Sequence, residues 1–119
     1  MTVADVLLLA AGGFIGAVLR YAISEKLNRS NGFPVGTLIV NLVGALLIGF
    51  AFGMKLPLIW TLFIVSGFAG ALTTFSTLNK ELLLLWQGGH RKAFYTYLFM
   101  TYVFGVLLTY IGFISGGNL

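Results

Sequence analysis

Four long apolar stretches divide the chain, and short polar connectors separate them. They cover about residues 3–23, 34–53, 57–86 and 93–115. Each has about 20 or more mostly apolar residues, the length that a helix needs to cross about 30 Å of hydrocarbon. The pattern predicts an all-α membrane protein in which residues 1–119 form one domain of four transmembrane helices.

The third stretch is predicted to break near its middle. A straight helix from Trp60 to Trp86 would measure roughly 39 Å at 1.5 Å per residue. Residues 67–78 read GFAGALTTFSTL, which gathers small and hydroxylated side chains around Phe75. In lipid, non-helical backbone is tolerated only where it is buried in protein or lines a polar path. We therefore expect a turn within residues 70–75, satisfied by side chains and by a second copy of the segment.

The composition supports a membrane protein and excludes several other classes. The chain is 59% hydrophobic and 8% charged, whereas soluble domains carry about 25% charged residues. It has no cysteine, so disulfides and thiolate metal sites are excluded. The three acidic residues assemble no nucleophile–base pair, so we do not expect an enzyme. The net charge of +4 lies mostly in the connectors, which favours contact with lipid headgroups over nucleic acid.

The distribution of basic residues predicts an orientation in a cell membrane. The first and third connectors lie on one side, and that side collects Arg20, Lys26, Arg29, Lys80, Arg91 and Lys92. The opposite side has only Lys55. The positive-inside rule therefore places the first and third connectors in the cytoplasm and both termini outside a plasma membrane.

Two polar residues stand out within the first two stretches. Arg20 lies near the end of the first stretch, where it could line a water-filled cavity or simply reach the interface. Asn41 lies about 10 Å into the second stretch, counted from Gly36 at 1.5 Å per residue. An unpaired amide is costly in hydrocarbon, so Asn41 is expected to face either a partner helix or a polar path.

Hydroxyl groups form a second candidate feature. Besides the hydroxylated residues of the third stretch, which include Ser76 and Thr77, the fourth stretch carries Tyr97 and Thr101 at helical spacing on one face. Such hydroxyls often bond to the carbonyl four residues earlier, but together they could line a track for an anion. The ring edge of Phe75 is electropositive and could also meet an anion.

The motifs GGFIGAVLRY at 12–21, GTLIVNLVG at 36–44 and GFAGALTTFSTL at 67–78 together resemble the Fluc/CrcB family of fluoride channels. The resemblance covers essentially the whole chain. It implies an antiparallel dimer that exports fluoride passively through two pores at the subunit interface. It also implies a structural Na⁺ at the dimer centre, held by the backbone carbonyls of Gly70 and Thr73. Hard cations take such oxygen ligands, often at half-helix ends.

The resemblance also assigns roles to single residues. It places Arg20 near the pore entrance, and it places in the fluoride pore Asn41, Phe75, Ser76, Thr77, Tyr97, Thr101 and position 78. At position 78 the chain has Leu78 where the family has a second phenylalanine. That departure, with the uneven charge, leaves two partners open: a second copy of this chain or a related subunit.

Two other functions compete with the channel. A four-span multidrug exporter would need a membrane-embedded carboxylate in the first span, and there the sequence has only Asp5, at the very start. A non-conducting subunit of a membrane assembly would explain the many glycines. It would leave Arg20, Asn41 and the hydroxyl cluster together unexplained.

Overall fold

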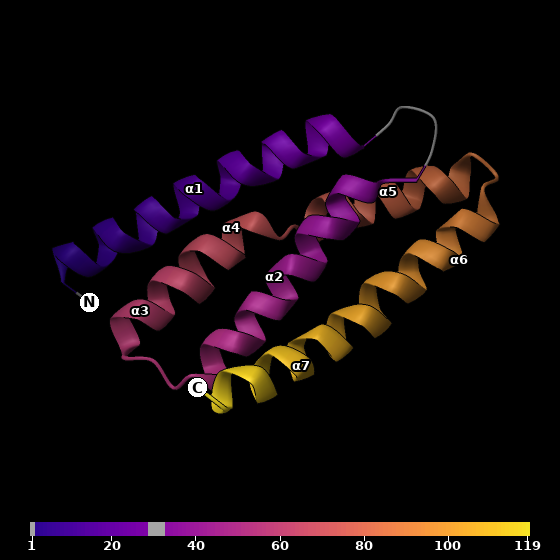
Figure 1. The fold of residues 1–119 in the computed structure, drawn as a ribbon. Helices are drawn as coiled ribbons and strands as arrows, with labels where there is room; N and C mark the ends of the chain where they lie inside the picture. The colour runs from indigo at the N-terminus through magenta and orange to yellow at the C-terminus, as the bar shows by residue number, and fades with distance from the viewer. Residues whose placement is uncertain (1, 29–32) are drawn as a thin grey trace.

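The computed structural model describes residues 2–28 and 33–119 and is almost entirely helical. Four helical stretches are long and apolar enough to cross a membrane, as the sequence predicts, at Val3–Leu27, Val35–Gly53, Leu58–Gln87 and Arg91–Gly117. They form an elongated bundle of 48 × 30 × 21 Å (Figure 1). Arg29, one of the charges counted for the orientation, lies outside the described residues.

The first two spans are single helices. Helix α1, Val3–Leu27, begins with a capping box in which the Thr2 and Asp5 side chains each bond the other's backbone N–H, at 3.3 and 3.0 Å. It runs four residues past its predicted end at 23. Helix α2, Val35–Gly53, follows Pro34 and lies in the middle of the bundle (Figure 1).

The third span is interrupted, as predicted. It begins as α3, Leu58–Thr61, continues as a π-helical segment η1, Leu62–Ala69, and ends its first half as α4, Gly70–Leu72. Thr73 and Thr74 are extended, and α5, Phe75–Gln87, resumes the span. The break is therefore narrower than the expected range 70–75, because Gly70 to Leu72 stay helical.

The fourth span is continuous but not uniform. It comprises α6, Arg91–Phe99, a π-helical segment η2, Met100–Phe104, and α7, Gly105–Gly117. The π-helical segments of the third and fourth spans had no counterpart in the sequence analysis. Such segments are rare and mark places where a helix accommodates a local distortion.

Two close helix contacts hold the bundle together. Helix α1 packs along η1 and α4, and α7 packs along α2 (Figure 1). In the second contact the glycines of each helix face carbonyl oxygens of the other: a Cβ at Gly49 would overlap the Thr109 oxygen, and one at Gly112 the Leu46 oxygen. Most of the glycines therefore serve packing, as small residues do in membrane helices.

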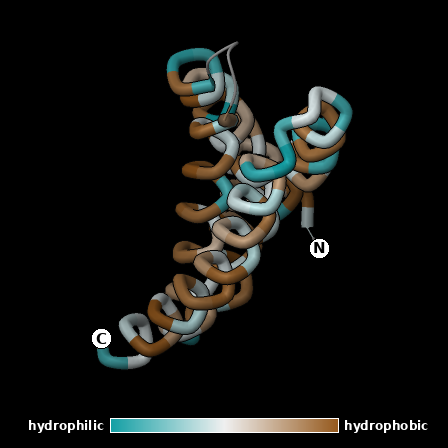
Figure 2. Tube along the Cα trace, turned by 90° about the vertical axis from the view of Figure 1, so that its right-hand side faces the viewer, coloured by the Kyte–Doolittle hydropathy of each residue, from teal (hydrophilic) through white to brown (hydrophobic). Residues whose placement is uncertain are grey.

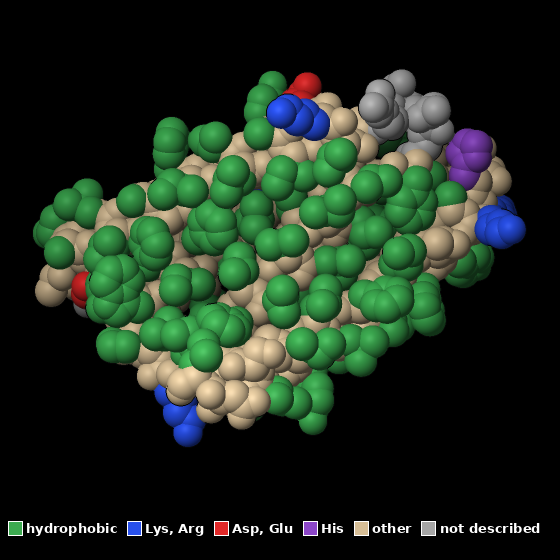
Figure 3. All heavy atoms as spheres, viewed as in Figure 1, with side chains coloured by type: hydrophobic (Ala, Val, Ile, Leu, Met, Phe, Trp, Pro, Cys, Tyr) green, Lys and Arg blue, Asp and Glu red, His purple; other side chains and the backbone are tan. Residues whose placement is uncertain are grey.

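The outer surface is that of a membrane protein. Hydrophobic residues run along the helices, and hydrophilic residues gather mainly at the turns (Figure 2). One face of the molecule is covered almost from end to end with hydrophobic side chains, while charged side chains lie near its edges (Figure 3). A hydrocarbon environment would accept such a surface without cost.

A polar network closes the bundle at the end of α1. Asn28 donates to the Thr37 hydroxyl at 3.0 Å and to the Glu81 carboxylate at 3.3 Å. Tyr97 donates to the other Glu81 oxygen at 3.1 Å. These bonds join the end of α1 to α2, α5 and α6. Tyr97 is fully buried beside Leu38 and Leu82, so the network lies against a small core.

Candidate functional site

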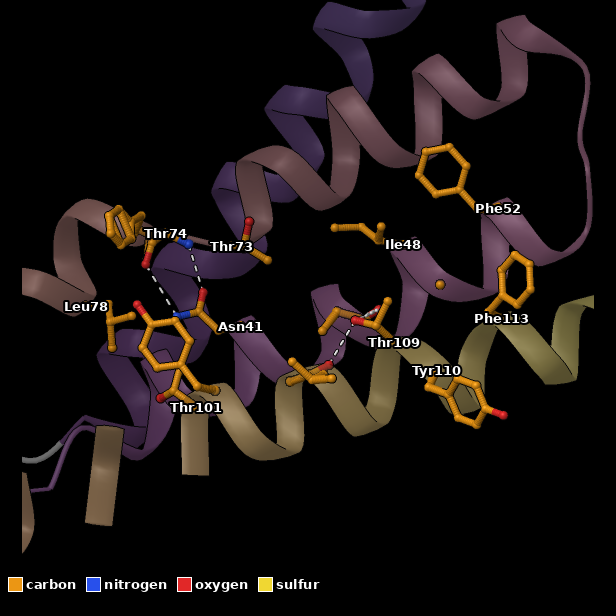
Figure 4. A pocket seen from close by; sticks show the side chains of 16 residues that line it. Asn41, Ile48, Phe52, Thr73, Thr74, Leu78, Thr101, Thr109, Tyr110 and Phe113 are labelled. Atoms are coloured by element: carbon orange, nitrogen blue, oxygen red, sulfur yellow. Dashed lines mark hydrogen bonds between the residues drawn. The ribbon is translucent and has the colours of Figure 1, made fainter. Parts of the chain in front are cut away.

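The break in the third span is held from outside by a side chain of α2. Asn41 accepts a hydrogen bond from the Thr74 amide at 2.8 Å and donates one to the Thr74 carbonyl at 3.4 Å (Figure 4). Its amide thus pairs with the extended backbone much as a neighbouring strand would. The expected partner of Asn41 is found: it is the broken backbone itself.

The local sequence explains why the third span becomes helical again, as α5, after only two extended residues. Thr74 is extended, with φ −150° and ψ 115°, and its hydroxyl accepts from the Thr77 amide at 3.1 Å. A threonine hydroxyl that bonds the amide three residues on is a standard helix N-cap. The first half ends similarly, since Thr73 bonds the Ala69 carbonyl through both its amide and its hydroxyl, each at 3.0 Å.

These contacts withdraw the helical donors of two carbonyls. In a continuous helix the Thr74 amide would bond the Gly70 carbonyl, and the Thr77 amide would bond the Thr73 carbonyl. Here the first amide goes to Asn41 and the second to the Thr74 hydroxyl. The carbonyl oxygens of Gly70 and Thr73 are therefore left without their usual helical amide partners. Such oxygens fit a hard cation, which prefers oxygen ligands.

Arg20 approaches the break from the other side. Its Nε donates to the Ala71 carbonyl at 3.1 Å, which ties α1 to the C-terminal end of α4. Arg20 is partly buried and stands outside the lining of the groove described next. The sequence predicts that Arg20 lines a water-filled cavity or reaches the interface, and the contact that the structure shows is instead with the backbone next to the break.

A groove of about 770 Å³ runs beside the break, and residues of α2, of the third span and of the fourth span line it (Figure 4). Five of the residues expected at the site line it: Asn41, Thr73, Phe75, Leu78 and Thr101. Phe75 is 64% exposed in the isolated subunit, whereas Leu78 is only 3% exposed and also packs in the core. The groove is mostly apolar, with a few polar groups near the break.

One polar group in the groove lacks a partner. Thr101 Oγ1 is buried, and within the described part of the chain it makes no hydrogen bond. A buried hydroxyl without a partner costs about 1–3 kcal/mol. The Thr101 hydroxyl therefore keeps a hydrogen-bond donor that the described residues leave unused.

The remaining expected residues lie elsewhere. Ser76 is exposed and Thr77 half-buried on the first turn of α5, and neither lines the groove. Tyr97 points into the core and bonds Glu81. Gly70 is exposed and, like these three, stands apart from the groove lining. The isolated subunit thus gathers part of the expected set.

The groove also has walls that the sequence analysis missed. On α2 they are Ala45, Ile48, Gly49 and Phe52, and on the fourth span they include Gly105, Thr109, Tyr110 and Phe113. The signal was present, because these positions follow Asn41 at intervals of 4, 7, 8 and 11 residues and Thr101 at intervals of 4, 8, 9 and 12. That spacing marks one face of a helix.

The described residues hold no metal site made of side chains. In ranges 2–28 and 33–119, no three His, Asp or Glu residues come together as ligands. A cation held by backbone carbonyls would not need such a cluster.

Comparison with known proteins identifies the family. The family model described as CrcB-like protein, Camphor Resistance (CrcB), matches residues 7–113. The chain belongs to the CrcB-like family. The resemblance inferred from the three motifs is thereby confirmed, and with its four membrane-capable helices the chain is a multi-pass membrane protein.

Curated relatives are similar over nearly the full length. One from Bacillus thuringiensis, named fluoride-specific ion channel FluC 2, is 40% identical over 115 residues, covering 95% of this chain and 98% of its own. One from Staphylococcus aureus strain NCTC 8325, named fluoride-specific ion channel FluC 1, is 45% identical over 114 residues, covering 91% and 93%.

Proposed function

We propose that the protein is a fluoride-selective channel that lets fluoride leave the cytoplasm passively. Relatives of this length that are named fluoride-specific ion channels support the proposal. The protein is not an enzyme, as its sequence predicts, since these relatives are named as channels. The observation that carries the proposal is the groove beside the Asn41-held break, whose lining includes both Phe75 and Thr101. The Thr101 hydroxyl has no partner within the described residues.

Conduction follows from replacing the water around a small anion. A pore selects an ion by its width and by the polar groups that substitute for the hydration shell. The Thr101 hydroxyl and the Asn41 amide are hydrogen-bond donors, and the exposed ring of Phe75 offers an electropositive edge. Fluoride, being small and hard, gains more from such donors than chloride does. The negative membrane potential then drives the anion outward.

The pore is completed by a second subunit in the opposite orientation. Alone, the subunit leaves the groove open and Phe75, Tyr110 and Phe113 more than half exposed. An antiparallel partner would cover it and would bring the two breaks together. A structural Na⁺ held there by Gly70 and Thr73 carbonyls would bind the subunits to each other. It would also offset the repulsion between anions.

The decisive experiment is a flux assay. Purified protein is reconstituted into liposomes loaded with KF or KCl, and anion efflux is recorded after a potassium ionophore is added. We expect rapid fluoride efflux and chloride efflux no faster than from empty liposomes. Equal rates for the two halides, or no fluoride efflux, would refute a self-sufficient fluoride channel.

A labelling experiment addresses the orientation and the partner. The chain has no cysteine, so a single Lys92→Cys variant can be labelled with an impermeant maleimide from either side of the cell membrane. A homodimer of opposed subunits predicts about equal labelling from the two sides, whereas a fixed heterodimer subunit predicts labelling from one side. Lys55→Cys, at the opposite end of the spans, is the matched control. It should be labelled equally from both sides in the homodimer, and only from the side opposite to Lys92→Cys in the fixed subunit.

A further inference from the structure

We propose that Arg20 is a positioning residue that keeps the Ala71 carbonyl out of the cation cage at the break. The inference rests on the proposed function, because it assumes a cation held by the carbonyls of Gly70 and Thr73. We call this set of carbonyl ligands the cation cage. The contact of Arg20 with Ala71 would explain how the cage distinguishes one cation from another.

The argument starts from the carbonyls at the end of α4. A helix end leaves its last four carbonyls without intrahelical donors. Here the Ala69 oxygen takes two bonds from Thr73, and the Ala71 oxygen takes the bond from Arg20. The helical donor of Gly70 has gone to Asn41. Thr73 and two side chains from other helices therefore decide which carbonyls keep a donor, and Arg20 removes Ala71 from the set without one.

Close packing of α1 fixes this contact. A Cβ at Gly16 would overlap the Phe68 carbonyl oxygen and would lie 3.2 Å from the Ala71 Cβ. Arg20 follows one helical turn later and so is carried directly to the end of α4. Guanidinium does not lose its charge in proteins, and its bond to a carbonyl is charge-assisted. Its positive charge also suits the negative end of a half-helix.

The number of free carbonyls bears on which cation the cage prefers. The selectivity of a carbonyl site depends on how many oxygens coordinate the ion and how freely they move. Without Arg20 each subunit could offer a third oxygen from Ala71. A larger and looser ligand set suits larger cations, so discrimination of Na⁺ from K⁺ should fall. A merely structural arginine would instead lower stability equally in both salts.

The first test uses three variants of the full-length purified protein. Thermal unfolding is followed while NaCl replaces KCl at constant ionic strength, and half-saturating concentrations of the two cations are compared. For Arg20→Gln we expect the Na⁺ preference to fall by about tenfold, the scale of one charge-assisted hydrogen bond. Arg20→Lys, which can still donate, should restore most of it. Lys26→Gln, an exposed charge on the same helix, should behave as the wild type. An unchanged preference in Arg20→Gln overturns the inference.

The second test needs no variant, so it decides the matter even if Arg20→Gln does not fold. Labelling Ala with carbonyl ¹³C and Leu with ¹⁵N selects the Ala–Leu pairs, which are Ala71–Leu72 and Ala45–Leu46. In lipid-embedded protein we expect the Ala71 carbonyl signal to stay in place, like that of Ala45, when K⁺ replaces Na⁺. A shift of the Ala71 signal on cation exchange overturns the inference.

The same approach tests the proposed cage separately. Gly with carbonyl ¹³C and Ala with ¹⁵N selects Gly–Ala pairs, among them Gly70–Ala71. If the Gly70 signal shifts on cation exchange and the Ala71 signal does not, both proposals stand. If neither shifts, the cage itself fails, and the role of Arg20 falls with it.

Discussion

The third and fourth spans have similar local features, but only the third is interrupted. Each contains a π-helical segment, η1 or η2, and each carries hydroxylated residues near its middle. The third span leaves the helix at Thr73 and Thr74, whereas the fourth continues from Met100 into α7. Hydroxyl groups alone therefore do not break a membrane helix.

The difference lies in what the neighbouring helices offer to the backbone. At the third span, Asn41 from α2 and Arg20 from α1 supply bonds to the freed amide and carbonyl groups. At the fourth span, the Thr109 hydroxyl bonds back to the Gly105 carbonyl and across to the Ala45 carbonyl, which leaves the backbone ladder in place. In lipid a break persists only where other groups satisfy the backbone.

The largest effect is expected at Asn41. Asn41→Leu removes both bonds to Thr74 and leaves two partly buried backbone groups unpaired, each of which costs up to about 1–3 kcal/mol. We expect a lower unfolding temperature and no fluoride efflux. Asn41→Asp keeps the acceptor for the Thr74 amide but puts a carboxylate in an anion path, so it should lose efflux with a smaller loss of stability. Wild-type efflux in either variant would remove Asn41 from the site.

Phe75 should give a loss of function without a loss of stability. Its ring is 64% exposed in the subunit, so little packing depends on it. Phe75→Ile removes the ring edge that meets the anion and should bring fluoride efflux close to background. Phe104→Ile changes an exposed ring, 41% accessible and outside the groove lining, and should keep wild-type efflux. Equal efflux in the two variants would argue against a ring in the path.

The sequence predicts the four spans and the interruption of the third, but not which residues leave the helix. Hydropathy and length predicted four spans, and the cluster around Phe75 predicted an interrupted third span. The sequence did not reveal that only Thr73 and Thr74 leave the helix, because that depends on which backbone groups Asn41 and Arg20 reach. The spacing of Tyr97 from Thr101 predicts only a shared helix face, and its place in the pore is what the family resemblance implies. The structure turns its hydroxyl toward Glu81, since the carboxylate lies across the core.

The fourth span stays continuous beside α2, and two glycines can test whether this depends on close packing between them. A Cβ at Gly49 would overlap the Thr109 oxygen, so Gly49→Ala should cost about 1–3 kcal/mol. A Cβ at Gly105 would meet no atom within 4 Å, so Gly105→Ala should leave stability unchanged. Thermal unfolding in detergent measures both. Equal unfolding temperatures would show that the two spans do not owe their difference to this contact.

The smallest effects on efflux and stability are expected at Thr101 and Thr109, two threonines that line the same groove. The Thr101 hydroxyl has no bond within the described residues, so Thr101→Val should not lower the unfolding temperature, while fluoride efflux falls several-fold. The Thr109 hydroxyl holds the Ala45 carbonyl at 3.2 Å, so Thr109→Val should lose about 0.6 kcal/mol, typical of such bonds in membranes, and keep its efflux. Efflux and unfolding temperature, measured on both variants, distinguish a hydroxyl that serves the anion from one that serves the helix. A Thr101→Val variant with wild-type efflux would place the anion path away from this wall of the groove.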